Sequence, residues 1–293
     1  MIRHVGVVGS GLMGAGIAEV CGRAVDSVVV YDASVAALAA GQKRIDGSLL
    51  RAVERGKQTV EQSEAIRSRI RFATEIDALA ECDLVVEAVA EDEATKVSVF
   101  RQLDAVVESK SAILASNTSS IPIMKIAMAT TRPEQVVGVH FFNPVPVLPL
   151  VEIVPSIVTS EDVETQVRSF VEDTLGKQVI RSQDRAGFIV NSLLIPYILA
   201  AIRLLESGFA SADDIDSGMV LGCAHPMGPL HLADLIGLDT VKAIAEAMYH
   251  EFKEPLYSPA PLLLRMTDAG LLGRKSGHGF FPYATAAAPG RRA

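Results

Sequence analysis

The sequence predicts an α/β protein, in which a doubly wound sheet is followed by an all-helical C-terminal domain. Short apolar runs rich in β-branched residues alternate with helix-like segments through residue 184, as in parallel strands joined by crossover helices. From Arg185 onward the pattern is entirely helical. A length of 293 residues suits two ordinary domains. We therefore expect one domain over 1–184 and a second over 185–293.

The composition is that of a globular protein and argues against several classes of partner. Hydrophobic residues make up 49% of the chain, and a net charge of −8 argues against nucleic-acid binding. The longest apolar stretch, Phe188 to Leu205, is interrupted by Asn191 and Arg203, which predicts a buried helix and no membrane span. The start of the chain leaves no room for a signal peptide, and the three cysteines lack metal-ligand or disulfide spacing. We expect a cytoplasmic protein without a bound metal.

A glycine-rich turn follows the first predicted strand, His4 to Val8. The run Gly9-Ser10-Gly11-Leu12-Met13-Gly14 has the G-x-G-x-x-G spacing and opens a helix over about 13–23. The first glycine permits the tight turn, the second lets the backbone approach a pyrophosphate, and the third allows close helix packing. The helix N-terminus favours the phosphates. The first domain is therefore predicted to be Rossmann-type.

An acid ends the second predicted strand, Ser27 to Tyr31. Asp32 lies about twenty residues past the glycines, where an acid bonds the adenosine ribose hydroxyls and repels a 2′-phosphate. NAD is therefore the predicted cofactor, in preference to NADP.

The segment from Gly41 to Arg71 is locally basic within an acidic chain, with eight basic residues against four acidic ones. Two helices with a turn near Gly56 fit it. Two interpretations stay open. Charged runs of this kind usually form a solvated helical face, but this one would also serve as a dock for an anionic substrate handle.

The α/β alternation resumes with a strand over 84–89, a helix over 93–108 and a strand over 111–116. The last of these strands ends in Asn117-Thr118-Ser119-Ser120. Polar residues at the carboxyl ends of parallel strands are where ligands bind in open α/β sheets. The same run is also compatible with an ordinary turn and a helix N-cap ahead of Pro122, and the two interpretations are not exclusive.

Two short apolar runs carry a histidine and a glutamate. His140 follows the run Val136 to Val139, and Glu152 lies inside the run Leu150 to Val154. Prolines between the runs force a turn, so two adjacent strands would bring the imidazole and the carboxylate side by side. A histidine paired with a carboxylate in this way can act as a general acid/base. The alternative is a hydrogen-bonded core histidine and a strand-edge glutamate.

The remainder of the chain predicts helices. A helix over 161–175 and a short strand over 177–180 come first. Further helices are expected over 187–208, 230–252 and 261–269, with a capping box at Ser211 and Asp214 opening another. An apolar helical unit of this size is expected to pair with a copy of itself, which predicts a homodimer. The tail from Ala284 is expected to be disordered.

Together these residues resemble the L-3-hydroxyacyl-CoA dehydrogenase family, and within it the bacterial 3-hydroxybutyryl-CoA dehydrogenases. The resemblance runs from Val5 to about Tyr283. It rests on the motifs GSGLMGAGIA, ASNTSS, HFFNPVPVLPLVEIV, GFIVNSLLIPY and HPMGPLHLADLIGLD. One departure is that the family often has Tyr after the Gly-Phe of its last motif, whereas Phe281 follows Phe280 here. The aromatic ring is kept.

The resemblance implies an NAD-dependent oxidoreductase that converts (S)-3-hydroxyacyl-CoA, with 3-hydroxybutyryl-CoA as the expected substrate, to the 3-ketoacyl-CoA and back. It implies that His140 takes the hydroxyl proton and that Glu152 orients it. The reacting oxygen would be bonded by Ser119 and Asn191. The implied NAD site is Gly9, Gly11, Leu12, Met13, Gly14, Asp32, Glu91, Lys96, Asn117 and Asn143. The candidates for binding coenzyme A are Ser48, Arg51, Arg55 and Lys57.

Two other functions stay open. A dehydrogenase of a free hydroxy or sugar acid such as gulonate would keep the histidine motif. A catalytically silent NADH-binding protein would have no need to keep His140, Glu152 and Ser119 together with Asn191. Chain-length preference, physiological direction and the pathway within fatty acid metabolism are left open by the sequence.

Overall fold

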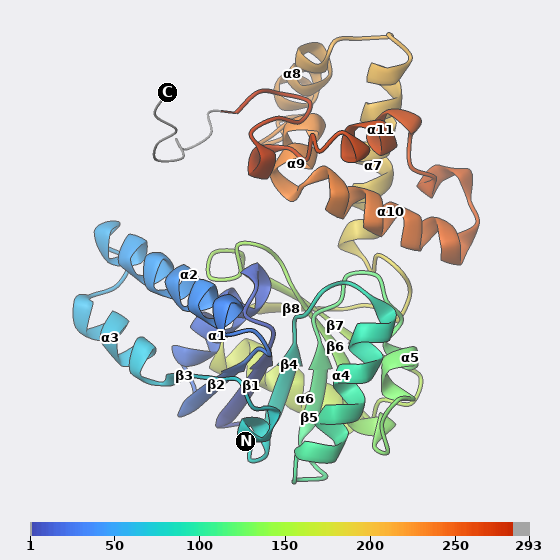
Figure 1. Ribbon diagram of the computed structural model, residues 1–293. Coiled ribbons are helices and arrows are strands. Elements are labelled where there is room, and N and C mark those ends of the chain that lie inside the picture. Colours follow the sequence, from blue (N-terminus) through green and yellow to red (C-terminus); the bar gives the residue numbers. More distant parts are fainter. Residues whose placement is uncertain (1, 284–293) are drawn as a thin grey trace. The chain divides into compact units, whose positions relative to one another are not determined.

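The computed structural model describes residues 2–283, and the chain divides into two compact units with the boundary after Phe188 (Figure 1). The first unit is a sheet covered by helices, and the second is helical. This arrangement confirms the predicted fold class. Within the described range, no helix is long and apolar enough to cross a membrane. The tail that was predicted to be disordered lies outside the described residues.

The sheet of the first unit has the order β3-β2-β1-β4-β5-β6-β7-β8 across the described residues. Neighbouring strands run parallel except β6 and β7, which are antiparallel. The chain moves outward from β1 to β3 and then returns to place β4 on the other side of β1, so the strand order reverses there. The strands are β1 (His4–Val8), β2 (Ser27–Tyr31), β3 (Ile70–Ala73), β4 (Leu84–Glu87), β5 (Ile113–Ser116), β6 (Val136–Phe141), β7 (Leu150–Pro155) and β8 (Gln178–Arg181).

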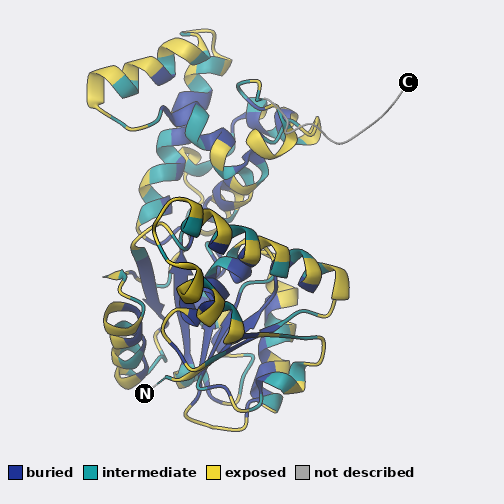
Figure 2. Cartoon of the chain, turned by 90° about the vertical axis from the view of Figure 1, so that its left-hand side faces the viewer, coloured by how far each residue is buried: buried dark blue, intermediate teal, exposed yellow. Residues whose placement is uncertain are grey.

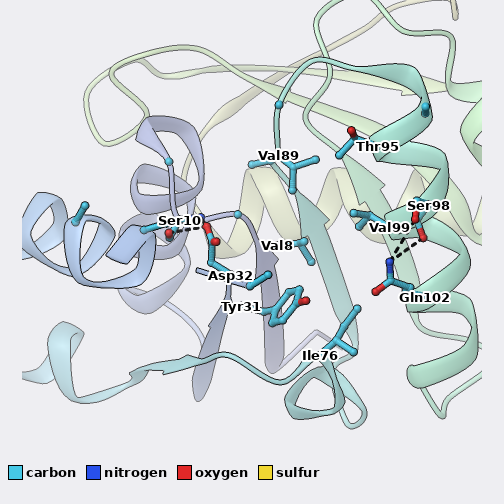
Figure 3. Close-up of a pocket in the computed structure, with 18 of the residues that line it drawn as sticks. Val8, Ser10, Tyr31, Asp32, Ile76, Val89, Thr95, Ser98, Val99 and Gln102 are labelled. Atoms are coloured by element: carbon cyan, nitrogen blue, oxygen red, sulfur yellow. Dashed lines mark hydrogen bonds between the residues drawn. The ribbon is translucent and has the colours of Figure 1, made fainter. Parts of the chain in front are cut away.

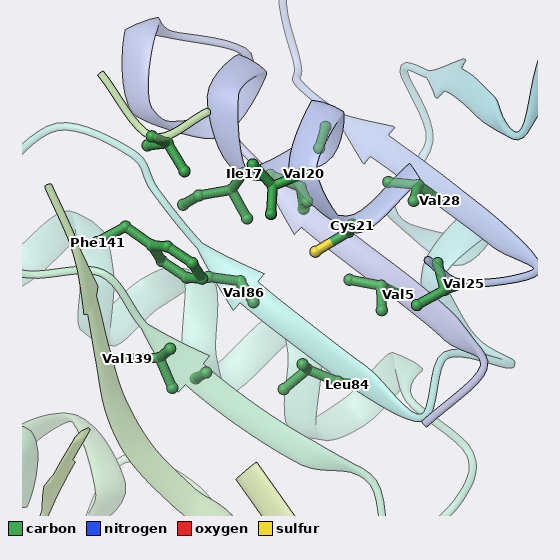
Figure 4. Close-up of a cluster of buried hydrophobic side chains, with 14 of the residues drawn as sticks. Val5, Ile17, Val20, Cys21, Val25, Val28, Leu84, Val86, Val139 and Phe141 are labelled. Atoms are coloured by element: carbon green, nitrogen blue, oxygen red, sulfur yellow. The ribbon is translucent and has the colours of Figure 1, made fainter. Parts of the chain in front are cut away.

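Both faces of the sheet are covered, which explains why its inner strands are continuous apolar runs. Val28 and Val30 belong to one apolar cluster, while Val29 between them belongs to the cluster on the opposite face. Figure 4 shows the first cluster, where α1 packs on β1 and β4. The helices of this unit are α1 (Leu12–Gly22), α2 (Val35–Glu54), α3 (Val60–Ser68), α4 (Glu93–Val106), α5 (Ile123–Ala127) and α6 (Glu161–Ser169). In Figure 2 most of the strands are buried and the helices expose their outer faces.

The basic segment forms the predicted pair of helices, α2 and α3, but its bounds differ from the prediction. The turn between them contains Gly56 at φ +64°, a left-handed conformation that favours glycine. The arm begins at Val35 and its second helix ends at Ser68, where β3 follows along β2. The prediction of helix through Arg71 is therefore wrong, because Ile70 is drawn into the core beside β2.

The second unit contains α7 (Val190–Glu206), α8 (Ala212–Cys223), α9 (Pro229–Ile236), α10 (Leu238–Phe252) and α11 (Pro261–Asp268). The single helix predicted over 230–252 is wrong. Gly237, at φ +102°, ends α9 and begins α10 in a conformation that a helix does not contain. Buried Asp234 accepts hydrogen bonds from Phe280 N, Phe281 N and the Tyr283 hydroxyl, each at 3.0 Å. This carboxylate fixes the end of the described chain to α9.

Candidate active site

The glycine turn has the geometry that a dinucleotide phosphate requires. Gly9 is at φ +96°, and its N–H donates to Tyr31 O at 2.8 Å. A Cβ on Gly14 would lie 1.9 Å from the carbonyl oxygen of Gly9, so α1 packs against the turn only because this residue is glycine. A Cβ on Gly11 would meet nothing within 4 Å. The space in front of Gly11, at the N-terminus of α1, therefore suits a diphosphate.

A cleft of about 910 Å³ opens beside this turn, at the carboxyl ends of β1, β2 and β4 (Figure 3). Asp32 lies in its wall. One oxygen of its carboxylate accepts from Ser10 N at 2.9 Å and Ser10 Oγ at 2.8 Å, and the other accepts from Ser34 N at 3.0 Å. The acid is thus held at the point where the strand order reverses, which is where doubly wound sheets bind nucleotides. These residues fit the adenosine half of NAD.

Two residues that were predicted to line the NAD site take part in a buried ion-pair network. Lys96 is 1% exposed, and its Nζ lies 2.6 Å from Glu87 and 3.3 Å from Glu91. Glu87 also accepts from Ser116 Oγ at 2.7 Å and Val89 N at 2.7 Å. Glu87 was not among the residues predicted from the sequence. Its position, as a carboxylate at the end of an otherwise apolar strand, could have indicated that it belongs to the site. Removing one member of such a network would leave a buried charge without its partner.

Glu91 shapes the loop after β5. Its Oε1 accepts from Thr118 Oγ1 at 2.6 Å, Ser119 N at 2.8 Å and Ser120 N at 3.0 Å. Burial raises the pKa of this carboxyl, but the charge of Lys96 and these hydrogen bonds outweigh burial, and the pKa is lowered overall. Glu91 therefore stays ionised and fixes the backbone of Ser119.

The polar run 117–120 forms a turn, in which Thr118 Oγ1 accepts from Ile121 N at 2.9 Å, but it does not cap the following helix as the simpler interpretation also expected. The N-cap of α5 is Pro122, and Asp184 accepts from the N–H groups of Ile123 at 2.6 Å and Met124 at 2.8 Å. A carboxylate distant in sequence thus satisfies the helix end. The run 117–120 instead positions Ser119 at the edge of the sheet.

His140 and Glu152 lie directly opposite each other in the antiparallel β6–β7 ladder. His140 Nδ1 and Glu152 Oε2 are 2.8 Å apart, and both side chains are buried. On the other side of the ring, Nε2 lies 3.1 Å from Ser119 Oγ. The rings of Phe142 and Phe188 stand edge-on to the imidazole at 4.6 and 5.5 Å between centroids. A histidine held in this way can exchange a proton at Nε2 while the carboxylate stabilises its charged form.

The other predicted residues occupy more varied positions. Asn117 Oδ1 accepts from Phe141 N at 2.8 Å and ties the end of β5 to β6. Asn143 lies in the exposed loop after β6, and Leu12 and Met13 begin α1. Asn191 is buried in α7 of the second unit, and its catalytic role stays a prediction. The candidates for coenzyme A lie on α2 or just after it, at Ser48, Arg51, Arg55 and Lys57.

The sheet combines a glycine turn at a helix N-terminus with an acid at the end of the next strand, and it also holds a buried His–Glu pair. This combination is typical of a dehydrogenase that uses a nicotinamide dinucleotide. Family comparison gives the same class. The family model described as "3-hydroxyacyl-CoA dehydrogenase, NAD binding domain" matches residues 4–185, and that of the "3-hydroxyacyl-CoA dehydrogenase, C-terminal domain" matches residues 187–283. The chain belongs to the 3-hydroxyacyl-CoA dehydrogenase family, and its cofactor is NAD.

Relatives extend over nearly the whole chain. A protein of Mycobacterium tuberculosis named 3-hydroxybutyryl-CoA dehydrogenase is 55% identical over 282 residues, covering 96% of this chain and 99% of the relative. A Bradyrhizobium diazoefficiens protein of the same name is 44% identical, covering 97% and 96%. Among solved structures, the (S)-3-hydroxybutyryl-CoA dehydrogenase PaaH1 from Ralstonia eutropha is similar with a TM-score of 0.91 and 44% identity, covering 97% of this chain and 100% of that one. The resemblance inferred from the motifs is confirmed.

Proposed function

We propose that the protein oxidises (S)-3-hydroxybutyryl-CoA to acetoacetyl-CoA with NAD, and catalyses the reverse reduction. The observation that carries this proposal is the imidazole of His140, paired with buried Glu152 on one side and with Ser119 on the other. The relatives named 3-hydroxybutyryl-CoA dehydrogenase support the choice of substrate.

The residues of the site divide the reaction between them. NAD, when bound, supplies the acceptor for the hydride that leaves C3 of the substrate. His140 removes the 3-hydroxyl proton at Nε2, because Nδ1 donates to Glu152 and Nε2, which faces Ser119 Oγ, is then the acceptor of the ring. Glu152 offsets the positive charge that develops on the ring. Ser119 hydrogen-bonds the reacting oxygen, and the family resemblance assigns the same role to Asn191.

Oxidation of NADH in the presence of three substrates tests this function. We expect acetoacetyl-CoA to be reduced far faster than free acetoacetate, with a long-chain 3-ketoacyl-CoA as the comparison for chain length. The near-ultraviolet absorbance of NADH is the measurement. Equal rates with free acetoacetate would favour a free-acid dehydrogenase, and no turnover of any substrate would favour a silent NADH-binding protein.

We further propose that the basic helical segment around α2 and α3 binds the coenzyme A moiety of the substrate. Ser48 and Arg51 are three residues apart on α2 and so share one face, Arg55 directly follows the last residue of the helix, and Lys57 lies in the turn beyond. Both arginines and the lysine are exposed. Contacts of such cations with phosphate are charge-assisted.

Replacing both Arg51 and Lys57 by Ala should raise the KM for acetoacetyl-CoA more than it lowers kcat, because handle contacts are made equally before and during the reaction. NAD affinity should be retained. S-acetoacetyl-pantetheine, which lacks the nucleotide phosphates, is the matched control, and its kinetics should be the same in wild type and variant. If the KM for acetoacetyl-CoA is also unaltered, α2 is only a solvated face.

We also propose a homodimer formed through the second unit. Large apolar side chains are exposed on this unit, among them Leu193 (74%), Phe209 (79%) and Leu221 (84%). An interface between two copies of a helical unit buries exposed apolar side chains of this kind. Light scattering at micromolar concentration is expected to give twice the mass of the chain, and a stable monomer would refute the proposal.

The site of action that we propose is the cytoplasm, in the metabolism of fatty acyl groups. Burial raises the pKa of Cys21 and of Cys82 to about 12, so both remain protonated thiols, and Cys223 is a free, exposed thiol. Free thiols suit a reducing compartment.

A further inference from the structure

Residues 142–149 form the loop that joins β6 to β7, just beyond the rung of the ladder that pairs the imidazole with the carboxylate. The loop has prolines at positions 144, 146 and 149, and these residues have no N–H to donate. The N–H groups of Val147 and Leu148 both donate to Pro144 O, at 2.9 and 3.0 Å. The loop therefore has few donors left for its other carbonyl oxygens, which need partners from elsewhere.

Lys177, in the turn before β8, supplies two of these donors. Its Nζ donates to Val145 O at 2.8 Å and to Leu148 O at 2.6 Å. The N–H of the next residue, Gln178, donates to Pro149 O at 2.8 Å. Hydrogen bonds from a charged donor are stronger than those between neutral groups. One short segment of chain thus holds three carbonyl groups of the loop.

The loop that Lys177 holds contacts both parts of the site. On one side, Val145 is buried against α1, where a Cβ on Gly16 would lie only 2.9 Å from Val145 Cβ. On the other side, the ring of Phe142 stands edge-on to the imidazole at 4.6 Å between centroids. Between these two contacts lies Asn143, one of the residues predicted to line the NAD site. A shift of the loop would therefore disturb the cofactor site and the packing of the imidazole together.

The ammonium group of Lys177 keeps this position although its surroundings disfavour a positive charge. The side chain is half-buried, and Arg23 of α1 is a charged neighbour. Burial lowers the pKa of Lys177, and the charge of Arg23 lowers it further. Glu19 pairs with Arg23 at 2.6 Å and offsets part of that charge. The groups that hold the ammonium are the two carbonyls of the loop.

We propose that Lys177 is a positioning residue, which fixes the loop 142–149 so that the nicotinamide half of NAD is held against His140. Lys177 acts through the backbone of the loop and not by contact with the cofactor. For turnover its role rests on the proposed function, and for affinity it rests on NAD binding alone. The adenosine half of NAD, at the glycine turn and Asp32, does not depend on this loop.

The test compares wild type with Lys177→Met, which keeps most of the side-chain length and removes the ammonium group. Calorimetry with NADH and with ADP separates the two halves of the cofactor. Affinity for NADH should fall about tenfold, as expected for lost charge-assisted contacts, and affinity for ADP should be unaltered. Lys110→Met removes an exposed lysine in the turn before β5, and this matched control should alter neither affinity. Equal weakening of NADH and ADP, or an unaltered affinity for NADH, would overturn the proposal.

Turnover provides a second measurement, in which kcat is expressed per ADP-binding site so that only folded protein is counted. With acetoacetyl-CoA and saturating NADH, Lys177→Met should lower this kcat by roughly tenfold to a hundredfold, because a misplacement of about 1 Å can cost about a hundredfold. A variant that is merely less stable would keep the wild-type kcat per ADP-binding site, and that result would overturn the proposal. If wild type does not reduce acetoacetyl-CoA and the difference between NADH and ADP is still seen, the proposed substrate is wrong and the role of Lys177 in cofactor binding stands.

Discussion

His140→Gln is expected to lower kcat by roughly a hundredfold to ten-thousandfold, the usual effect of removing a positioned general acid/base. The fold and the NAD affinity should be retained, because the cofactor site rests on the glycine turn and Asp32, which lie at other strands of the sheet. Steady-state kinetics and NADH titration together measure both quantities. A variant with near-normal kcat would show that the proton is transferred elsewhere.

Glu152→Gln keeps the shape of the side chain and removes its charge, so it should also lower kcat. The combined His140→Gln, Glu152→Gln variant should be far less impaired than the product of the two single effects, because the pair acts as one unit at 2.8 Å. Independent, multiplicative effects would show that Glu152 acts without His140.

Gly14→Ala is the second substitution with a large expected effect. The added Cβ would lie 1.9 Å from Gly9 O, a backbone atom, so the turn must move. Overpacking of this kind costs about 1–3 kcal/mol, and the Kd for NAD should rise roughly tenfold to a hundredfold as the phosphate site shifts. The melting temperature should fall as well, because the same contact packs α1 on the sheet.

Gly11→Ala separates packing from cofactor binding. Gly11 is at φ −63°, which alanine adopts easily, and its Cβ would meet no protein atom within 4 Å. Its melting temperature should therefore stay at the wild-type value while NAD binding weakens. Gly218→Ala, inside α8 and also facing open space, is the control that should leave NAD binding unaltered and raise the melting temperature slightly, because alanine favours a helix over glycine. Tight NAD binding by Gly11→Ala would show that the diphosphate does not approach this backbone.

Most of the strands that the sequence predicts correctly are buried on both faces, and the exception is the edge strand β8, whose end residues are exposed. Val28, Val29 and Val30 alternate between two apolar clusters, so the whole strand is apolar and is easily recognised. β3 has a weaker pattern, since exposed Arg71 lies between Ile70 and Phe72, and it directly follows a helix. The break at Gly237 is hidden for a different reason. Apolar residues continue at helical spacing on both sides of it, and only the backbone conformation ends the helix.

The sequence predicts those site residues that lie at or near the ends of strands. It does not predict the contacts that depend on how residues distant in sequence pack together. His140 and Glu152 are suggested by two strands joined through a short loop, and the ladder places them opposite each other. The contact of Ser119 with the imidazole depends instead on how Glu91 folds the loop after β5. Burial of Lys96 against Glu87 depends likewise on the packing of α4 on the sheet.

In the proposed reaction, His140 accepts the proton while hydride passes to NAD from a 3-hydroxyacyl-CoA. The most direct measurement is a single turnover, in which wild type and His140→Gln, each saturated with NAD, are mixed with (S)-3-hydroxybutyryl-CoA and NADH formation is followed. We expect a fast phase in the wild type, and in the variant a phase of similar amplitude that is slower by roughly a hundredfold or more. The same rate in both proteins, or equally fast NADH formation by the wild type from free (S)-3-hydroxybutyrate, would contradict the account.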